Sequence, residues 1–259
     1  MKRFKELLQP SLLKTTLLQL SFFLSLYLAI VSNANISWWV FAFIAFCLYT
    51  MIGNNLGMHR YFSHDQFEAS KPVEYILLWF ASMIGFGSPI NYAVTHLVHH
   101  KYPDTEYDPH GPTRGYKSFL WYFHHVPNLT ESPIFTRRIV ELHRKYQWVH
   151  DYYLLFIVVN ALIFLLIDYR LFLFGWLLPI GFTLNVMAYS VWRQHTGFKP
   201  VNDWFHWFDI LNEGLHKNHH EYPSAPNNAF RKGEIDWTYL FSKLFFLKYK
   251  WKGQPTKQD

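Results

Sequence analysis

The sequence predicts an all-α membrane protein with four transmembrane helices in two hairpins and a cytosolic helical cap that holds a metal site. Three observations predict this class. Of the 259 residues, 51% are apolar and 20% are aromatic. The apolar residues form four runs, each close to the roughly 20 residues that a membrane-spanning helix needs. Eight histidines form three short clusters outside these runs. Residues 1–259 are expected to form a single integral-membrane domain, since no repeat, low-complexity tract or linker divides them.

The four apolar runs pair into hairpins because only short turns, residues 33–37 and 168–170, separate the members of each pair. The third run is near the lower length limit for a span. A further apolar stretch, residues 74–94, is interrupted by two glycines and a proline and is expected to form a buried or interfacial helix. The expected spans are residues 12–32, 38–57, 152–167 and 171–191.

Basic residues predict the orientation in the membrane. Lys and Arg concentrate in the N-terminus, in residues 58–151 and in the C-terminal tail, whereas the two hairpin turns contain only Arg170. Positive residues stay on the cytoplasmic side, so both termini and all eight clustered histidines are expected there. The net charge of +6 fits this bias and an anionic lipid surface better than nucleic acid, for which no motif is present.

The N-terminus has features of a secretory signal, with MKRFK before an apolar run and a small residue at Ala34. The run is longer than the usual core of about 7–15 residues and a second span follows at once, which favours a retained helix. The only cysteine, Cys47, lies inside the second expected span and is expected to pack as a small apolar residue. A single cysteine excludes an internal disulfide, a cysteine-ligated cluster and a zinc ribbon.

The histidine clusters predict two metal ions. A structural zinc takes about four ligands and a catalytic zinc about three plus a water, so eight imidazoles are too many for one ion. Imidazole suits zinc, copper, iron and nickel, so the ligand type alone leaves the metal open. One HxxHH could arise by chance, but two such triplets and a pair, each beside an apolar run, favour metal binding. The clusters are His59 and His64 in HRYFSH, His96, His99 and His100 in HLVHH, and His216, His219 and His220 in HKNHH.

The spacing within the clusters predicts their geometry. In HLVHH and HKNHH the histidines at i, i+3 and i+4 are neighbours on one helical face, so three imidazoles can converge from a single turn. The five-residue step in HRYFSH advances about 500° on a regular helix and leaves the two rings roughly 140° apart. His59 and His64 are therefore expected either to straddle a helix end or to serve different metals.

Other titratable residues carry weaker expectations. His195 follows the fourth span, on the face where the site is expected, whereas the remaining histidines are expected to be surface or hydrogen-bonded residues: His110, His124, His125, His143, His150 and His206. The Glu-x-x-His motif of soluble di-iron bundles and the HExxH motif of metalloproteases are both absent. Ligating histidines usually donate their second N–H to a carboxylate or carbonyl. The candidates for that role, with solvated loop charges as the alternative, are Asp104, Glu106, Asp108 and Glu213.

With these clusters located, the chain resembles the membrane fatty acid desaturases, most closely the part of the family that includes stearoyl-CoA and bacterial acyl desaturases. The resemblance covers most of residues 40–245. HRYFSH resembles the first histidine box of the family, HRxxSH, and HLVHHKYPDTEYDPHGPTRGY resembles the second box with the elements that follow it. NEGLHKNHHEYP and EIDWTYL resemble the third box and the segment behind it.

The resemblance implies a four-span protein whose cytosolic cap holds two irons and uses dioxygen to insert a cis double bond into a saturated acyl chain. That chain would be linked to CoA, a carrier protein or a lipid, and electrons would come from a separate cytochrome b-type protein or ferredoxin. A bacterial cytoplasmic membrane is expected ahead of an ER-type one. The implied iron ligands are the eight clustered histidines and His195.

Departures from the family pattern concern other positions. Val94 and Thr95 stand where acyl-CoA members commonly carry an Arg-Asp pair, and Val191 stands where members often carry Asn. Leu215 replaces a common aromatic residue and Lys217 a common Asn. These changes leave the histidines intact. They affect the positions that would bind the CoA headgroup and would make one water-mediated iron contact.

An acyl substrate and a reactive oxidant together require a long, dry tunnel. Helix packing or an interfacial aromatic belt is the alternative role for each candidate wall residue. The candidate tunnel residues are Trp79, Phe86, Tyr92, Phe182, Tyr189 and Trp192.

Two alternative functions are a related di-iron hydroxylase or ketolase, because the same oxidant can return oxygen to the carbon, and a metal transporter or sensor. Transport predicts ionisable residues inside the spans, and the spans hold few of them.

Overall fold

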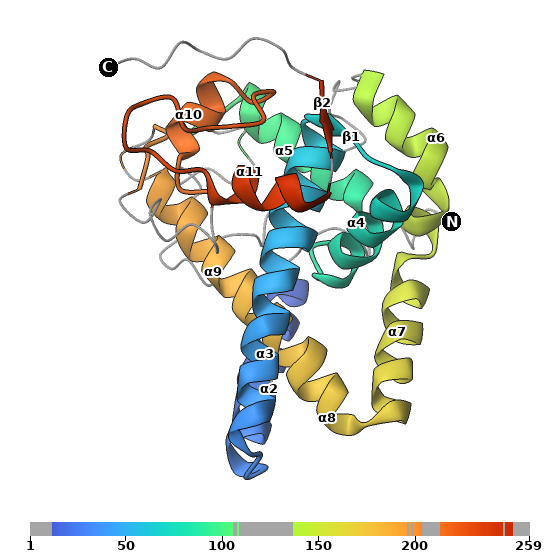
Figure 1. Cartoon of the computed structure of the whole chain (residues 1–259). Helices are drawn as coiled ribbons and strands as arrows, with labels where there is room; N and C mark the ends of the chain where they lie inside the picture. Colours follow the sequence, from blue (N-terminus) through green and yellow to red (C-terminus); the bar gives the residue numbers. More distant parts are fainter. Residues whose placement is uncertain are drawn as a thin grey trace.

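The computed structural model describes residues 12–105, 108, 137–195, 197, 199–203, 213–245 and 247–250. Within them the fold is mostly helical, with long apolar helices projecting from one side of a cap of shorter helices (Figure 1). The helices are α2 (Leu12–Val31), α3 (Ile36–Leu48), η1 (Tyr49–Ser63), α4 (Lys71–Met83), α5 (Pro89–Lys101), α6 (Arg137–Asp151), α7 (Tyr153–Ile167), α8 (Tyr169–Phe172), η4 (Leu173–Leu177), α9 (Leu178–Gln194), α10 (His216–Glu221), α11 (Trp237–Ser242) and η6 (Lys243–Phe245). The strands are β1 (Phe67–Glu68) and β2 (Lys248–Tyr249).

Among the described residues, two helices are long and apolar enough to cross a membrane: Ile36–Ser63, formed by α3 and η1, and Tyr169–Gln194, formed by α8, η4 and α9. α6 and α7 meet at a bend of 55° and count as a third candidate if they form one span. The part of α2 whose side chains are described, Thr16–Val31, is apolar and shorter than these. Two to three of the four predicted spans therefore meet the criteria of length and composition.

Large apolar side chains cover the outer faces of α2, α3 and α7. Leu166 is 83% exposed and Ile36 is 76% exposed, and many neighbours on these helices are also accessible. Contiguous apolar surface of this extent is uncommon on soluble proteins. It is expected for helices that satisfy all their backbone hydrogen bonds internally and face lipid. The chain is a membrane protein.

α2 and α3 both pack on η4 and α9, and one glycine permits the close approach of α2. A Cβ atom placed on Gly181 of α9 would lie 2.3 Å from Cδ2 of Phe22 in α2. A hydrogen bond from Gln19 Nε2 to Asn185 Oδ1, 3.0 Å long, joins the same two helices. Apolar packing and this polar contact together hold α2 against the helix that leads to His195.

The stretch predicted as one helix, residues 74–94, is divided between α4 and α5. Gly85 and Gly87 adopt positive φ angles of 91° and 102° in the turn between them, a conformation that glycine reaches without steric cost. Ser88 then caps α5 by accepting a hydrogen bond from Asn91 N, and Pro89 begins the helix, where its missing N–H is tolerated. The break lets α5 take its own direction and bring HLVHH against η1.

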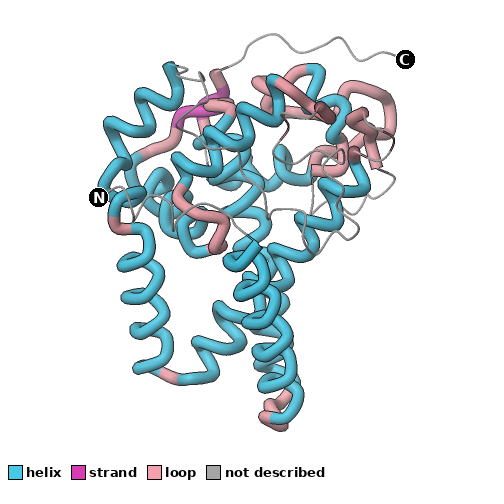
Figure 2. Tube along the Cα trace, turned by 180° about the vertical axis from the view of Figure 1, so that it is seen from behind, coloured by secondary structure: helices cyan, strands magenta, loops and turns pink. Residues whose placement is uncertain are grey.

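A short antiparallel ladder, which the all-α prediction did not include, fastens the C-terminal segment to the cap. Phe67 pairs with Tyr249 and Glu68 with Lys248. Figure 2 shows this strand pair beside α6, close to the cap surface. The backbone N–H of Lys250 also donates to the Gln66 carbonyl at 3.0 Å. The residues after the first histidine cluster are thereby tied to the end of the described chain.

We expect Gly181→Ala to lower the apparent Tm of the purified protein in detergent. The added methyl group would overlap the Cβ and ring of Phe22, and overpacking of this kind costs about 1–3 kcal/mol. For a chain of this size, that cost corresponds to a fall of roughly 2–12 °C. Gly175→Ala is the milder comparison, because its Cβ would meet only the ring edge of Phe41, at 3.0 Å. Equal stability of the two variants would contradict the close approach of α2 and α9.

Candidate metal centre

Nine histidines converge in two buried groups, each with one ring nitrogen per residue turned inward. Within a group the candidate ligand atoms all lie within 4.8 Å of one another. The groups adjoin, since the rings of His100 and His220, one from each group, stack with centroids 4.3 Å apart. The first group is His59, His64, His96, His100 and His219, and the second is His99, His195, His216 and His220.

The first cluster reaches a single group because its helix is wound differently from an α-helix. Residues 49–63 form a π-helix, whose hydrogen bonds join residues i and i+5. The backbone N–H of His64 donates to the His59 carbonyl at 3.1 Å, and the two ring centroids are 4.9 Å apart. His64 directly follows the last residue of this helix, as one of the two alternatives predicted. His64 lies in the same group of candidate ligand atoms as His59, which favours a shared metal over the alternative that the pair serves two metals.

Each HxxHH cluster divides between the two groups. In α5, His96 and His100 join the first group and His99 joins the second. α10 does the reverse, because its first and last histidines join the second group and His219 joins the first. Positions i+3 and i+4 differ by about 100° around a helix, so neighbouring histidines on one face point to different centres. The three histidines of each triplet therefore share a helical face, as predicted, and divide between the two groups.

The nitrogen spacing fits metal ions of high coordination number. In the first group the successive Nε2–Nε2 distances are 2.9, 3.0, 3.0 and 2.8 Å along a chain that runs from His59 to His64. In the second group they are 3.1, 3.0 and 2.8 Å, running from His99 to His195. Ligands at right angles around an ion about 2.1 Å away lie about 3.0 Å apart, whereas tetrahedral ligands lie about 3.4 Å apart. The donor set therefore fits two transition-metal ions.

Six of the nine imidazoles are held in the neutral form that binds metal. Burial, and then the proximity of other imidazoles, lowers the pKa of these rings well below the usual value. Neutral imidazole offers a lone pair to a metal ion, whereas imidazolium does not. The rings concerned are those of His64, His96, His100, His216, His219 and His220.

Two carboxylates orient histidines of the second group. Nδ1 of His99 donates to both oxygens of Asp108 at 2.9 Å. Nδ1 of His195 likewise donates to Asp104, at 3.0 and 3.1 Å. Because the proton is held at Nδ1, the Nε2 lone pair of each ring faces the group. Both carboxylates were candidates for this contact from the sequence, and Glu106 lies outside the described residues.

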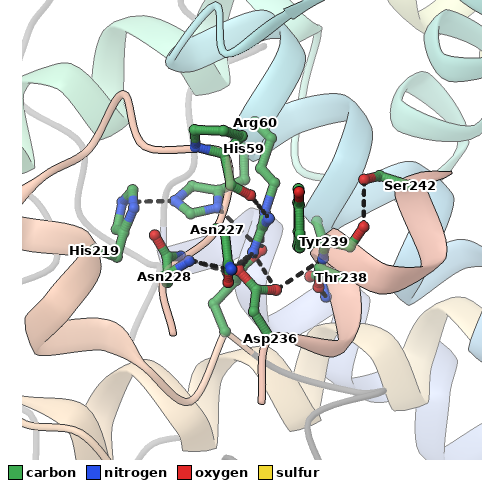
Figure 3. A network of polar contacts seen from close by, with 12 residues as sticks. His59, Arg60, His219, Asn227, Asn228, Asp236, Thr238, Tyr239 and Ser242 are labelled. Carbon is green, nitrogen blue, oxygen red and sulfur yellow. Dashed lines mark hydrogen bonds and ion pairs between the residues drawn. The ribbon is translucent and has the colours of Figure 1, made fainter. Parts of the chain in front are cut away.

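The third carboxylate candidate, Glu213, belongs to a buried charge network whose members Arg60 and Asp236 are seen in Figure 3. Glu213 Oε1 lies 3.5 Å from His59 Nδ1, and both carboxylate oxygens of Glu213 accept hydrogen bonds from Arg60, at 2.9 and 2.7 Å. Nη2 of Arg60 also donates to both oxygens of Asp236, at 2.8 and 2.9 Å. Arg60 is only 1% exposed, so its charge is balanced entirely within the protein.

The two carboxylates that share Arg60 differ in their proton affinity. Burial raises the pKa of Glu213, but Arg60 and His59 outweigh it and hold this pKa well below its usual range. Burial raises the pKa of Asp236, and although Arg60 opposes this effect, the nearby Glu213 reinforces it, so the pKa stays above its usual range. Asp236 also accepts hydrogen bonds from the backbone N–H groups of Asn228 and Tyr239. The network thus joins η1 to the segment that follows α10.

Arg60 and Asp236 were not identified as site residues from the sequence. Arg60 stands inside HRYFSH at the end of an apolar run, where the positive-inside rule accounts for a basic residue without a partner. The available signal was EIDWTYL, a segment with an acidic residue behind the third cluster. Its pairing with Arg60 spans 176 positions and could not be inferred from spacing.

A cavity of about 40 Å³ touches both histidine groups. It can hold a water molecule, and Tyr92, one of the predicted tunnel residues, forms part of its wall. The Tyr92 ring lies nearly parallel to that of His96, with centroids 5.6 Å apart. The lining residues are Asn54, His59, Tyr92, His96, His99, Met187, Val191, Gln194, Glu213 and His216.

The other predicted tunnel residues contact neighbouring helices or rings. Trp79 donates its Nε1 proton to Asn160 Oδ1 at 3.0 Å, and Phe182 packs edge-on against Phe22 with centroids 5.1 Å apart. Their role in substrate binding stays a prediction. The residues in this set are Trp79, Phe86, Phe182, Tyr189 and Trp192.

The histidines expected to have no catalytic role are separate from the two groups where the structure describes them. His143 is exposed on α6. His150 Nδ1 lies 2.6 Å from Ser88 Oγ, at the start of α5. The others, His110, His124, His125 and His206, lie outside the described residues.

Comparisons of the sequence with known proteins identify its family. The sequence model of a family described as fatty acid desaturase matches residues 36–235, more than half of the chain. An sn-1 stearoyl-lipid 9-desaturase of Anabaena variabilis is 27% identical over 249 residues, covering 86% of this chain and 88% of the relative. An acyl-CoA C20 Delta5-desaturase of Anemone leveillei is 28% identical over 242 residues, covering 84% and 74%. A chloroplastic palmitoyl-monogalactosyldiacylglycerol delta-7 desaturase of Arabidopsis thaliana is 25% identical over 227 residues, covering 80% and 60%.

We expect Arg60→Met to abolish the folded protein. It leaves two buried carboxylates without a cation, and breaking a buried ion pair in this way costs about 3–5 kcal/mol. The measurement is the yield of monodisperse protein in size-exclusion chromatography. Arg60→Lys should be intermediate, because an ammonium keeps the charge but not the planar fork. Adding Glu213→Gln and Asp236→Asn to Arg60→Met should recover part of the yield. A wild-type yield of Arg60→Met alone would refute the charge balance described here.

Proposed function

Since the chain belongs to the fatty acid desaturase family and is an oxidoreductase, we propose that it uses dioxygen to insert a cis double bond into a saturated fatty acyl chain. The family predicted from the histidine clusters is thereby confirmed. The metal we propose is iron, two ions per chain. The nine histidines would hold these ions in two groups, the first through five residues and the second through four.

One observation carries the proposal: two adjacent, buried groups of imidazoles whose inward nitrogens are 2.8–3.1 Å from their neighbours. Two iron ions bound there would supply the activation of dioxygen that removal of hydrogen from an unactivated methylene requires. Uncharged ligands place no negative charge of their own on the metals. The second ion distinguishes this arrangement from a single zinc site of four ligands or fewer.

The chain's own residues would prepare this chemistry. Asp104 and Asp108 hold protons at Nδ1 of His195 and His99 and so keep the Nε2 atoms turned inward. Tyr92, Met187 and Val191 form part of the cavity wall beside both groups. We propose that a segment of the acyl chain is received at this wall, whose side chains would exclude water from the reacting carbon. The cavity of about 40 Å³ is far smaller than a typical ligand pocket, so entry of the acyl chain requires its walls to separate.

We further propose that four helices span the membrane in one integral-membrane unit, with the histidine groups and both termini on the cytosolic side. The apolar helices extend from one side of the cap in Figure 1, and basic residues are nearly absent from the two hairpin turns. The proposed location is a bacterial cytoplasmic membrane ahead of an ER-type one. The proposed partners are membrane lipid and a separate one-electron carrier, a cytochrome b-type protein or a ferredoxin.

Removing one histidine from each group should remove different metal ions. We expect about two iron ions per chain in the wild type and about one in either His219→Ala or His99→Ala, because each variant deprives only one group of a ligand. Iron would be measured by inductively coupled plasma mass spectrometry on purified protein. His143→Ala is the matched control, since that histidine is exposed on α6, and it should retain both ions. Full iron content in both ligand variants would disprove the assignment.

The activity test is gas chromatography–mass spectrometry of total fatty acids from a host that expresses the chain. We expect new monounsaturated fatty acids with the wild type and none with His99→Ala, whose second histidine group is incomplete. The double-bond position and the chain length follow from the same spectra. A hydroxylated acyl product without an olefin would show that the chain is a hydroxylase and not a desaturase. The same monoenes in both strains would show that the host, rather than this chain, makes them.

A further inference from the structure

A basic hollow lies on the cap, away from the cavity between the histidine groups. It has a volume of about 750 Å³ and is formed by α6, the residue after the first histidine cluster and the end of the β2 segment. α6 and the strand pair lie side by side in Figures 1 and 2. The residues that line the hollow are Asp65, Arg137, Arg138, Val140, Glu141, Arg144 and Lys250.

The charge of this hollow is positive and only partly balanced. Asp65 contacts both Arg138, at 2.9 Å, and Lys250, at 2.6 Å. Glu141 contacts Arg138 at 3.4 Å and Lys145, outside the hollow, at 3.2 Å.

Two further guanidinium groups, those of Arg137 and Arg144, line the hollow and are exposed. Within the described part of the chain, neither has an acidic partner. The lining contains four basic and two acidic side chains, a net charge of +2 by subtraction. An anionic surface is therefore its natural complement.

The hollow is built directly on the segment that carries the first histidine cluster. Arg138 donates to the backbone carbonyls of Tyr61 and Phe62, and the bond to Phe62 is 3.0 Å long. Both carbonyls belong to residues between His59 and His64. Asp65, at the edge of the hollow, directly follows His64 in the chain. A protein bound over this hollow would thus contact the outer side of the segment that supplies two histidines of the first group.

We infer that this hollow is the docking site of a soluble one-electron carrier protein with an acidic surface. The inference rests on the proposed function, which requires such a partner. Conversion of CH₂–CH₂ and O₂ to CH=CH and two waters takes four electrons into oxygen: two come from the substrate, and two, with two protons, must be delivered from outside. Redox partners form small, weak interfaces in which charge complementarity sets the rate of encounter.

The test compares purified wild-type protein with the double variant Arg137→Glu/Arg144→Glu in stopped-flow oxidation of a reduced soluble carrier. An acidic [2Fe–2S] ferredoxin and the soluble domain of a cytochrome b-type protein are each used. Arg231→Glu/Lys232→Glu is the matched control, because it reverses an exposed basic pair elsewhere on the cap. Arg137→Gln/Arg144→Gln removes the charge without reversing it and provides a second variant should the first fail to fold. Dithionite replaces the carrier in a parallel assay of product.

We expect the second-order rate constant of carrier oxidation to fall about tenfold or more in the Glu variant at low ionic strength and less in the Gln variant. The difference should shrink as salt is added, because salt screens exposed charges. The control and the dithionite-driven activity should be unchanged. Equal rates for wild type and Glu variant, an equal loss in the control, or wild-type oxidation of neither carrier would overturn the docking site. Absence of an olefin with dithionite and dioxygen would instead overturn the proposed function, while carrier oxidation still decides the docking site.

Discussion

The arrangement of this protein depends on bringing nine histidine ring nitrogens from separate segments into two buried groups. Nitrogen lone pairs that face one another at about 3 Å do not stabilise the fold unless a cation lies among them. Packing elsewhere must therefore hold the helices at the rotations that bring these nitrogens together. η1, α5 and α10 each present histidines at a fixed rotation, and His195 directly follows α9. The glycine turn before α5, the close contact of α2 with α9 and the strand pair beside α6 all serve to fix those rotations.

Charge balance is supplied from outside the histidine groups. Neutral ligands leave the charge of bound metal ions uncompensated, and an isolated charge in a dry interior is unfavourable. Asp104 and Asp108 face the second group through its histidines, and Glu213 faces the first through His59. Arg60 holds Glu213 and Asp236 together in the metal-free protein, so these carboxylates are not left unpaired before metal arrives. The network of Figure 3 therefore stabilises the fold and sets the electrostatic field at the centre.

The spacing of residues predicted the parts of the structure that are local and periodic. The apolar runs predicted the long helices, and the clusters predicted which histidines come together. Asp108 lies beside His99, its near neighbour in sequence, whereas Asp104 contacts His195, 91 positions away. Spacing on a regular helix could not predict π-helical winding, and so it left the relation of His59 to His64 open. Contacts between distant segments, such as Arg60 with Asp236, carry no local signal. The sequence could not predict which aromatic residues line a cavity, because an apolar helix surface has the same composition whether it faces lipid, a neighbouring helix or a cavity.

Because η1 is wound as a π-helix, the number of residues in this segment determines where its histidines and the residues after them lie. One extra residue per turn is accommodated along residues 49–63, and the i to i+5 bond fixes the five-residue step between its two histidines. Deleting one residue between them would restore the step of a regular helix, but it would rotate everything beyond and misplace Asp65 and β1. Insertions and deletions are expected to be far less tolerated in this segment than in the two hairpin turns, residues 33–37 and 168–170.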